Sequence, residues 1–279
     1  MGVYKLAQLQ IRPSAIAGAW YPGSATLLKK TIEDYLVDVP VFDSKRTIHG
    51  IISPHAGYIY SGAIAAYGYR QIQDCDYDLV VILSPIHQYY SGKYIINEAD
   101  LYATPLGEVP VDKEAIEKLK RSVDITFVSY DEEHALEIQL PFLQVVLNSF
   151  KILPIMFGPT KLDETDELIA DLLPIITSQR TLIVISTDLH HINDYAEVHV
   201  RDQNVINALK SFNLTELRKI LNRTECSVCG KVPLFTGLKI LESIGHTQIQ
   251  ILKHLNSGDV TGEKNRGQYT VGYLSGIVY

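Results

Sequence analysis

Three apolar runs of the sequence end in turns that carry residues able to hold a metal ion or a proton. These turns are SPHAGYIYSG with His55, SPIHQYY with His87, and STDLHH with Asp188, His190 and His191. In α/β proteins, ligands bind in the crevice outside the carboxyl ends of the strands. The three turns are therefore predicted to bring their side chains into one crevice, provided that the strands before them are neighbours.

A fourth segment, CSVCG at residues 226–230, supplies two thiols. Cys229 lies nearest the start of a predicted helix, where unpaired backbone N–H groups and the positive end of the dipole favour a thiolate. The thiolate is the form that reacts and that binds metals. The pair Cys226 and Cys229 does not predict a structural zinc ribbon, which needs a second such pair. Its late position also argues against a thioredoxin-like redox motif.

A fifth segment, DEEHALE at residues 131–137, places His134 and Glu137 three apart on a predicted helix and so on one face. Both are expected to orient ligands by hydrogen bonds. A single histidine in a turn is more often a solvated or hydrogen-bonded residue than a ligand, so the prediction depends on the coincidence at the strand ends. Trp20 is expected to pack in the core.

Apolar, β-branched runs alternate with longer amphipathic segments, which is the pattern of an α/β fold. Strands are predicted at Thr47–Ile52, Leu79–Leu83, Tyr94–Leu101, Lys151–Met156, Thr181–Ile185, Thr247–His254 and Tyr269–Val278. Helices are predicted at Thr26–Leu36, Ser61–Gln71, Lys113–Arg121, Glu132–Phe150, Glu164–Ser178, Val198–Phe212, Thr215–Leu221 and Val232–Ile244. The last two strands are expected to pair antiparallel in a mixed sheet. No linker or repeat divides the chain, so one domain over residues 1–279 is predicted.

Composition excludes several classes of protein. The formal charge of −7 over 279 residues is the wrong sign for a nucleic-acid partner. The longest uncharged stretch, Thr47–Tyr69, contains proline, serines, histidines and four glycines, so no membrane span is expected. The first twenty residues lack the apolar block of a secretory signal, and three cysteines do not make a disulfide framework. A cytoplasmic protein with free thiols is predicted.

The motifs together resemble the Memo-like family, also called the AmmeMemoRadiSam system protein B group, which is related to the LigB-type class III extradiol dioxygenases. The matching segments, in chain order, are AGAWYPG, SPHAGYIYSG, SPIHQ, EHALEIQLPFLQ, STDLHH and CGKVPLFTGL. The resemblance spans nearly the whole chain. It implies a single α/β domain with a central mixed sheet and helices on both faces.

The resemblance also implies a pocket in which His55, His87 and Cys229 replace the two-histidine, one-carboxylate iron ligands of the dioxygenases. Asp188 and His191 match the pocket-lining Asp and His of the family. His134, in the Glu-His-x-x-Glu signature, joins these two as a candidate catalytic residue. The family commonly has Pro-Ser-His-His where this chain has Pro-Ile-His-Gln, so Ile86 and Gln88 replace a hydroxyl and an imidazole.

Two imidazoles and a thiolate suit copper or iron, and zinc is also compatible, whereas soft sulfur disfavours magnesium and calcium. The first hypothesis is a metal-dependent oxidoreductase acting on a small molecule. Ring cleavage of the dioxygenase type is disfavoured because a thiolate beside oxygen is itself oxidisable. The alternatives are an adaptor that binds a peptide or phosphopeptide in the same pocket, and a component of a modification system with a radical-SAM protein as partner.

Overall fold

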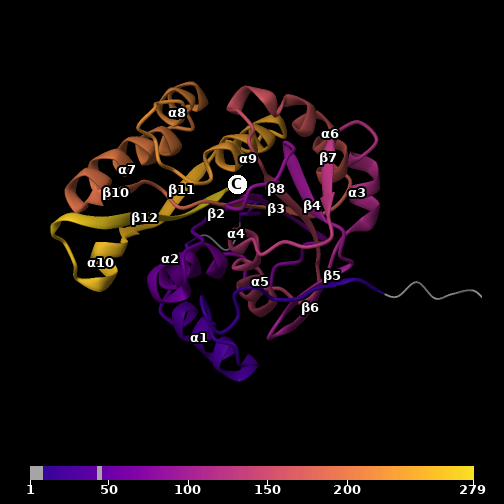
Figure 1. The fold of residues 1–279 in the computed structure, drawn as a ribbon, viewed down its shortest axis with the longest axis horizontal. Coiled ribbons are helices and arrows are strands. Elements are labelled where there is room, and N and C mark those ends of the chain that lie inside the picture. The colour runs from indigo at the N-terminus through magenta and orange to yellow at the C-terminus, as the bar shows by residue number, and fades with distance from the viewer. Residues whose placement is uncertain (1–8, 43–45) are drawn as a thin grey trace, which may run out of the picture.

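A nine-stranded mixed sheet forms the centre of the molecule (Figure 1). The computed structural model describes residues 9–42 and 46–279; residues 1–8, which begin the segment searched for a secretory signal, lie outside this range. The strands run in the order β10-β12-β2-β9-β3-β8-β4-β7, and β11 pairs with β12. Their bounds are β2 Gly50–Ser53, β3 Leu79–Pro85, β4 Tyr94–Asn97, β7 Ile125–Val128, β8 Lys151–Phe157, β9 Thr181–Ser186, β10 His191–Asp194, β11 Ile249–Asn256 and β12 Arg266–Val278.

Strands β2, β9, β3 and β8 are mutually parallel, and every residue of β2 and β3 is buried. Strands that are covered on both faces consist of nearly continuous apolar residues. This is why these strands could be predicted from the sequence. The predicted antiparallel pairing of the last two strands is confirmed by β11 and β12.

Helices cover both faces of the sheet, as predicted (Figure 1). One layer contains α3 Lys113–Leu119, α6 Asp166–Thr177, α7 Tyr195–Lys210, α8 Leu214–Leu221 and α9 Lys231–Ser243. The other contains α1 Ala25–Val37, α2 Tyr58–Arg70, α4 His134–Glu137 and α5 Leu140–Val146. Both layers contribute to one large hydrophobic core cluster. None of the helices in the described part of the chain is both long and apolar enough to span a membrane.

Two predicted elements are interrupted. The predicted strand Tyr94–Leu101 ends at Asn97, because the side-chain oxygen of Asn97 accepts the Ala99 N–H at 2.8 Å and turns the chain. The predicted helix Glu132–Phe150 divides into α4 and α5, since Pro141 lacks the N–H that would continue the first helix and instead opens the second.

Several short elements had no recognisable pattern in the sequence. These are β1 Ile11–Arg12, β5 Leu101–Thr104 and β6 Gly107–Pro110, which form a separate three-stranded sheet, together with β7, β10, the 3-10 helix η1 Leu162–Glu164 and the helix α10 Ser257–Thr261. Most span two to five residues, too few for a hydrophobic period to show.

Candidate metal centre

The three histidine-bearing turns meet because their strands are neighbours. Strand β9 lies between β2 and β3 and is parallel to both, so the carboxyl ends of all three open at the same edge of the sheet. A cavity of about 620 Å³ occupies this edge. It is lined by Ala19, Trp20, His55, Ala56, Gly57, Ile59, Tyr60, His87, His134, Asp188, His191, Ser227, Cys229, Tyr269 and Val271. All six residues predicted for the site therefore share one cavity.

His55 directs one ring nitrogen into the cavity. The Ser186 hydroxyl donates to the Ala135 carbonyl at 2.6 Å, so it can only accept from Nδ1 of His55, 3.0 Å away. The proton is thereby assigned to Nδ1, and Nε2 carries a free lone pair. Nε2 is buried and has no hydrogen-bond partner. Burial and the nearby imidazoles, His87 foremost, hold the pKa of His55 well below its usual value, so the ring is neutral.

His87 is fixed in the same way by a carboxylate. Its Nδ1 lies 2.9 Å from Oε1 of Glu133, and its backbone N–H donates to the other oxygen of that carboxylate. Burial tends to raise the pKa of Glu133, but the hydrogen bonds from His87 and the charges of His87 and His134 together outweigh it, so the pKa lies below its usual value. An ionised carboxylate only accepts, so His87 also has its proton on Nδ1 and presents Nε2.

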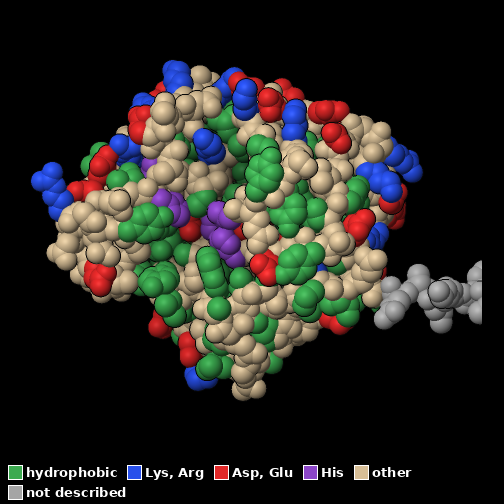
Figure 2. Space-filling model, viewed as in Figure 1, with side chains coloured by type: hydrophobic (Ala, Val, Ile, Leu, Met, Phe, Trp, Pro, Cys, Tyr) green, Lys and Arg blue, Asp and Glu red, His purple; other side chains and the backbone are tan. Residues whose placement is uncertain are grey.

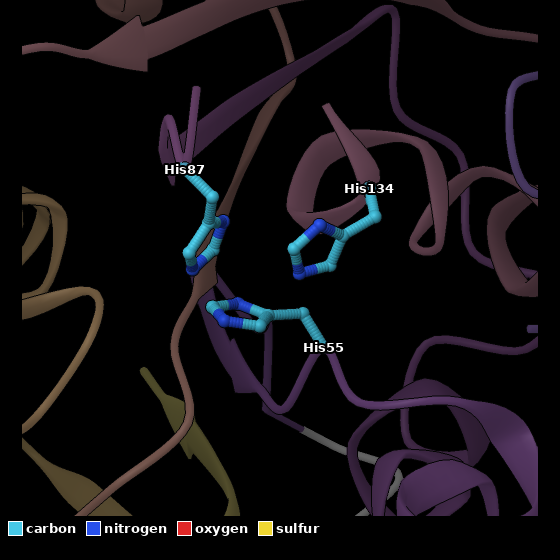
Figure 3. A group of neighbouring side chains, drawn as sticks. All are labelled: His55, His87 and His134. Atoms are coloured by element: carbon cyan, nitrogen blue, oxygen red, sulfur yellow. The ribbon is translucent and has the colours of Figure 1, made fainter. Parts of the chain in front are cut away.

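His134 completes a cluster of three imidazoles (Figure 3). Its ring stacks on His87 with centroids 4.3 Å apart and lies tilted against Trp20 with centroids 4.2 Å apart. Burial lowers the pKa of His134 to about 4 despite the adjacent Glu133. Trp20 was expected in the core, but it is 36% exposed and forms part of the cavity wall.

Cys229 also lines the cavity and pairs with His191. Its Sγ is 2.9 Å from Nε2 of His191, whose Nδ1 is 2.9 Å from the Tyr269 hydroxyl. Burial, together with His87, lowers the pKa of His191 to about 4. The neutral ring therefore accepts a hydrogen bond from the Cys229 thiol on Nε2 and donates one to the Tyr269 hydroxyl from Nδ1.

The expectation that the helix start makes Cys229 acidic is wrong for the metal-free protein. Helix α9 begins two residues later, at Lys231, and burial followed by the Asp188 carboxylate raises the pKa of the Cys229 thiol. Desolvation of the thiolate exceeds the attraction of a helix end. A bound cation would reverse this balance.

Asp188 lies at the base of the cavity. Its Oδ1 accepts the backbone N–H of His55 at 2.8 Å, and its Oδ2 is 3.9 Å from His55 Nε2. Burial raises the pKa of Asp188 to about 7, opposed by the His55 N–H. The carboxyl group is thus able to take up or release a proton near neutral pH.

Two groups of potential metal ligands overlap at His55 among the described residues. The first group consists of His55, His87 and His134, and the second of His55, Asp188 and Cys229. Within each group, all ligand atoms lie within 4.8 Å of one another. The predicted ligands are therefore divided between two groups that share His55.

The sequence interpretation missed the residues that orient the histidines. Glu133 and Ser186 are fully or almost fully buried, and each fixes one ring. Both lie next to residues that were singled out, but neither has a ligand-like spacing.

Glu137 was expected to orient metal ligands, but it binds the N-terminal segment. Its carboxylate accepts hydrogen bonds from Arg12, Ser14 and Tyr21 at 2.6–2.7 Å. It thereby anchors the segment that carries Trp20 to the cavity wall.

The cavity lining is apolar apart from its titratable groups and Ser227, and no Lys or Arg is among its described residues. Figure 2 shows histidine side chains gathered at the centre of this face, with hydrophobic side chains around them. Such a pocket offers soft and neutral donors and no cation for a phosphate.

Comparison with known proteins agrees with the motif analysis. The sequence model of the family described as Memo-like protein matches residues 12–277. A MEMO1 family protein of Thermotoga neapolitana is 34% identical over 96% of this chain and 99% of its own length. One from Methanosarcina acetivorans is 33% identical over 97% of this chain and 100% of its own length. One from Nitrosopumilus maritimus is 30% identical over 94% of this chain.

Proposed function

The chain belongs to the Memo-like family, and from this premise we propose that it binds a redox-active transition metal, copper or iron, through His55, His87 and Cys229. The observation that carries the proposal is Nε2 of His55, which is buried without a partner. Buried polar atoms are nearly always satisfied, and an unsatisfied one needs a reason. A lone pair held toward two further donors is satisfied by a metal ion.

The donor set supports the choice of metal. Two neutral imidazoles and a thiolate suit copper, iron or zinc, while hard cations prefer oxygen. Ser186 and Glu133 bind the far nitrogens of the two rings. Such partners fix the tautomer and raise the basicity of the ligand.

Ligation by Cys229 requires that its thiol lose a proton. His191 is neutral and already in hydrogen-bond contact with the sulfur, so it is positioned to receive that proton. Tyr269 holds the ring in place from the other side. Metal binding is therefore expected to release protons and to strengthen as pH rises.

The reaction class that best fits this site is oxidation or reduction of a small molecule. A bound copper or iron ion would supply one-electron exchange. Asp188, with its pKa of about 7, holds a proton beside the ligands, and His134 and His191 are neutral bases in the same cavity. Trp20, Ile59, Tyr60 and Val271 give the cavity a largely apolar wall against which a substrate can pack.

The adaptor alternative has less support, because a phosphate-reading pocket should contain Arg or Lys and the described lining residues include neither. Titration with a phosphotyrosine peptide tests it directly, and saturable binding would favour the adaptor. The radical-SAM partner and the cytoplasmic location stay predictions.

Metal analysis of anaerobically purified protein tests the proposal. We expect stoichiometric copper or iron in the wild type after loading and loss of that metal in His55→Ala. His49→Ala is the matched control, since His49 lies outside the cavity lining and should leave metal content unchanged. Wild-type protein without stoichiometric metal under every loading condition would overturn it.

A second comparison identifies the third ligand, because His134 competes with Cys229 for that position. Cys229→Ser should abolish the thiolate-to-copper charge-transfer absorption, and His134→Gln should preserve it. Absence of this absorption in the copper-loaded wild type, with loss of copper in His134→Gln but not in Cys229→Ser, would assign the site to the three imidazoles.

A further inference from the structure

A second cluster of cysteine, histidine and aspartate lies beside the metal centre, outside its cavity lining. Nδ1 of His190 is 2.9 Å from Oδ1 of Asp202, and the His190 ring also hydrogen-bonds to Cys226. His190 and Asp202 are 3% and 0% exposed, and Cys226 is half-buried. The order thiol, imidazole, carboxylate is the arrangement that activates a nucleophile.

The Asp202 carboxylate is fixed in position by several contacts. Its Oδ1 also accepts the backbone N–H of His190 at 3.0 Å, and its Oδ2 is 3.2 Å from Nε2 of His254. A Cβ at position 272 would lie 1.8 Å from Oδ2, so Gly272 provides the space that the carboxylate occupies. Three contacts thus fix the carboxylate that orients the His190 ring.

The thiol faces a small cavity of its own, of about 150 Å³. Its charged lining residues are His190, Arg201, Arg223 and Glu225. Arg201 binds Glu197 and the Glu225 carbonyl, whereas the Arg223 side chain has no hydrogen bond or ion pair within the described part of the chain. Arg223 thus lines the same cavity as the thiol, and its guanidinium can stabilise negative charge on a leaving group there.

The three cysteines differ in their surroundings although all three are half-buried. Burial raises the pKa of the Cys226 thiol, but the hydrogen bonds from His190 and from the Val228 N–H, with Lys231 nearby, outweigh it, so the net pKa lies below its ordinary value. Burial and adjacent aspartates raise the pKa of Cys75. Cys229 also contacts an imidazole, but burial raises its pKa, so of the three cysteines Cys226 is the one whose thiol pKa is lowered.

We propose that Cys226, His190 and Asp202 form a second reaction site, in which the Cys226 sulfur attacks a small hydroperoxide. The sulfur forms a bond to one peroxide oxygen as the O–O bond breaks. Sulfur loses two electrons and becomes a sulfenic acid, and the departing oxygen receives the thiol proton through His190 and leaves as water or an alcohol. Arg223 stabilises the charge on that oxygen.

The size and chemistry of this cavity favour a peroxide over larger electrophiles. A cavity of about 150 Å³ admits a molecule of only a few heavy atoms. Cys226 and Asp202 do not occur in either group of potential metal ligands among the described residues. The proposal is thus independent of the metal centre and stands or fails separately.

The test treats the full-length wild type with hydrogen peroxide and dimedone, which traps sulfenic acids, and maps the label by mass spectrometry. We expect Cys226 to be labelled at least about tenfold faster than Cys75, because only Cys226 of these two has an imidazole partner that takes up its proton. Cys75 is the matched control inside the same molecule, equally half-buried and without an imidazole. Equal rates at the two cysteines would overturn the proposal.

Asp202→Asn then tests whether the carboxylate acts through His190. The variant should lower the rate at Cys226 toward that at Cys75 and move the pH profile of Cys226 labelling to higher pH, with Cys75 unchanged. A general loss of structure would instead change all three cysteines together. An unchanged ratio and profile would remove Asp202 from the site and overturn the triad.

Discussion

Two consecutive histidines, His190 and His191, each contact a cysteine, yet the pKa values of the two pairs are shifted in opposite directions. Burial tends to lower the pKa of His190, but the hydrogen bonds to Asp202 and Cys226 raise it to about 9. His191 contacts Cys229 and Tyr269, and its pKa falls to about 4. The pKa of Cys226 is lowered and that of Cys229 is raised.

The difference between the two pairs comes from one directly bonded carboxylate. Asp202 stabilises the imidazolium form of His190, which in turn stabilises the Cys226 thiolate. A phenol is the corresponding partner of His191, so no directly bonded carboxylate offsets the desolvation of charge there, and the more distant Asp202 does so only in part. The first pair is prepared to react without a metal, whereas the second keeps its proton until a cation displaces it.

The largest expected effect is that of Gly272→Ala, which removes the space for Asp202. The carboxylate would have to leave its contacts with His190 and His254, since a Cβ would lie 1.8 Å from Oδ2. We expect a loss of about 4 kcal/mol in the free energy of unfolding, from overpacking and a displaced charge. Urea denaturation measures it. Gly276→Ala on the same strand, with its nearest heavy atom at 3.2 Å, is the control; equal losses would deny Asp202 this role.

The two buried aspartates should respond to neutralisation with opposite signs. Asp202→Asn removes the charge that His190 binds, and we expect a loss of about 2–3 kcal/mol. Asp188→Asn removes a charge that burial disfavours and keeps the oxygen that accepts the His55 N–H, so at pH 8 we expect a gain on the order of 2 kcal/mol. Urea denaturation of chelator-treated protein measures the change in unfolding free energy for each variant. If both variants lose stability or both gain it, the contrast between the two aspartates is wrong.

The pH dependence of the Asp188 effect follows from its raised pKa of about 7. Between roughly pH 4 and 7 the folded protein holds a proton that the unfolded chain has lost, so unfolding free energy falls as pH rises through this window. Asp188→Asn should lack this part of the slope and match the wild type below about pH 4.

The smallest expected effect is that of Tyr269→Phe, which removes the hydroxyl that holds His191. We expect metal affinity to fall by about 3- to 10-fold, at the lower end of outer-shell effects, because the ring loses its fixed orientation and not its place. Competition with a chromophoric chelator measures this change. Tyr60→Phe, another cavity tyrosine, is the control. An equal loss in both variants would make the effect nonspecific.

The strand ends were predictable because apolar, β-branched runs and their Ser-Pro turns are local features of the sequence. His55, His87 and Asp188 followed from those runs, and Cys229 from its position before a helix. The partners Glu133 and Ser186 could not be predicted in this way, since a buried carboxylate or hydroxyl has no periodic signal. The pKa direction of Cys229 was predicted wrongly because burial, a tertiary property, outweighs the helix end.

By itself, the sequence determined the α/β pattern, the residues at three strand ends and the similarity to the Memo-like family, because these depend on local order along the chain. The tertiary structure decided that β9 lies between β2 and β3, and hence that the residues meet. It also decided which histidine contacts a carboxylate. The physical reason is that proton affinity depends on burial and on charges brought together from distant parts of the chain, which no local pattern records.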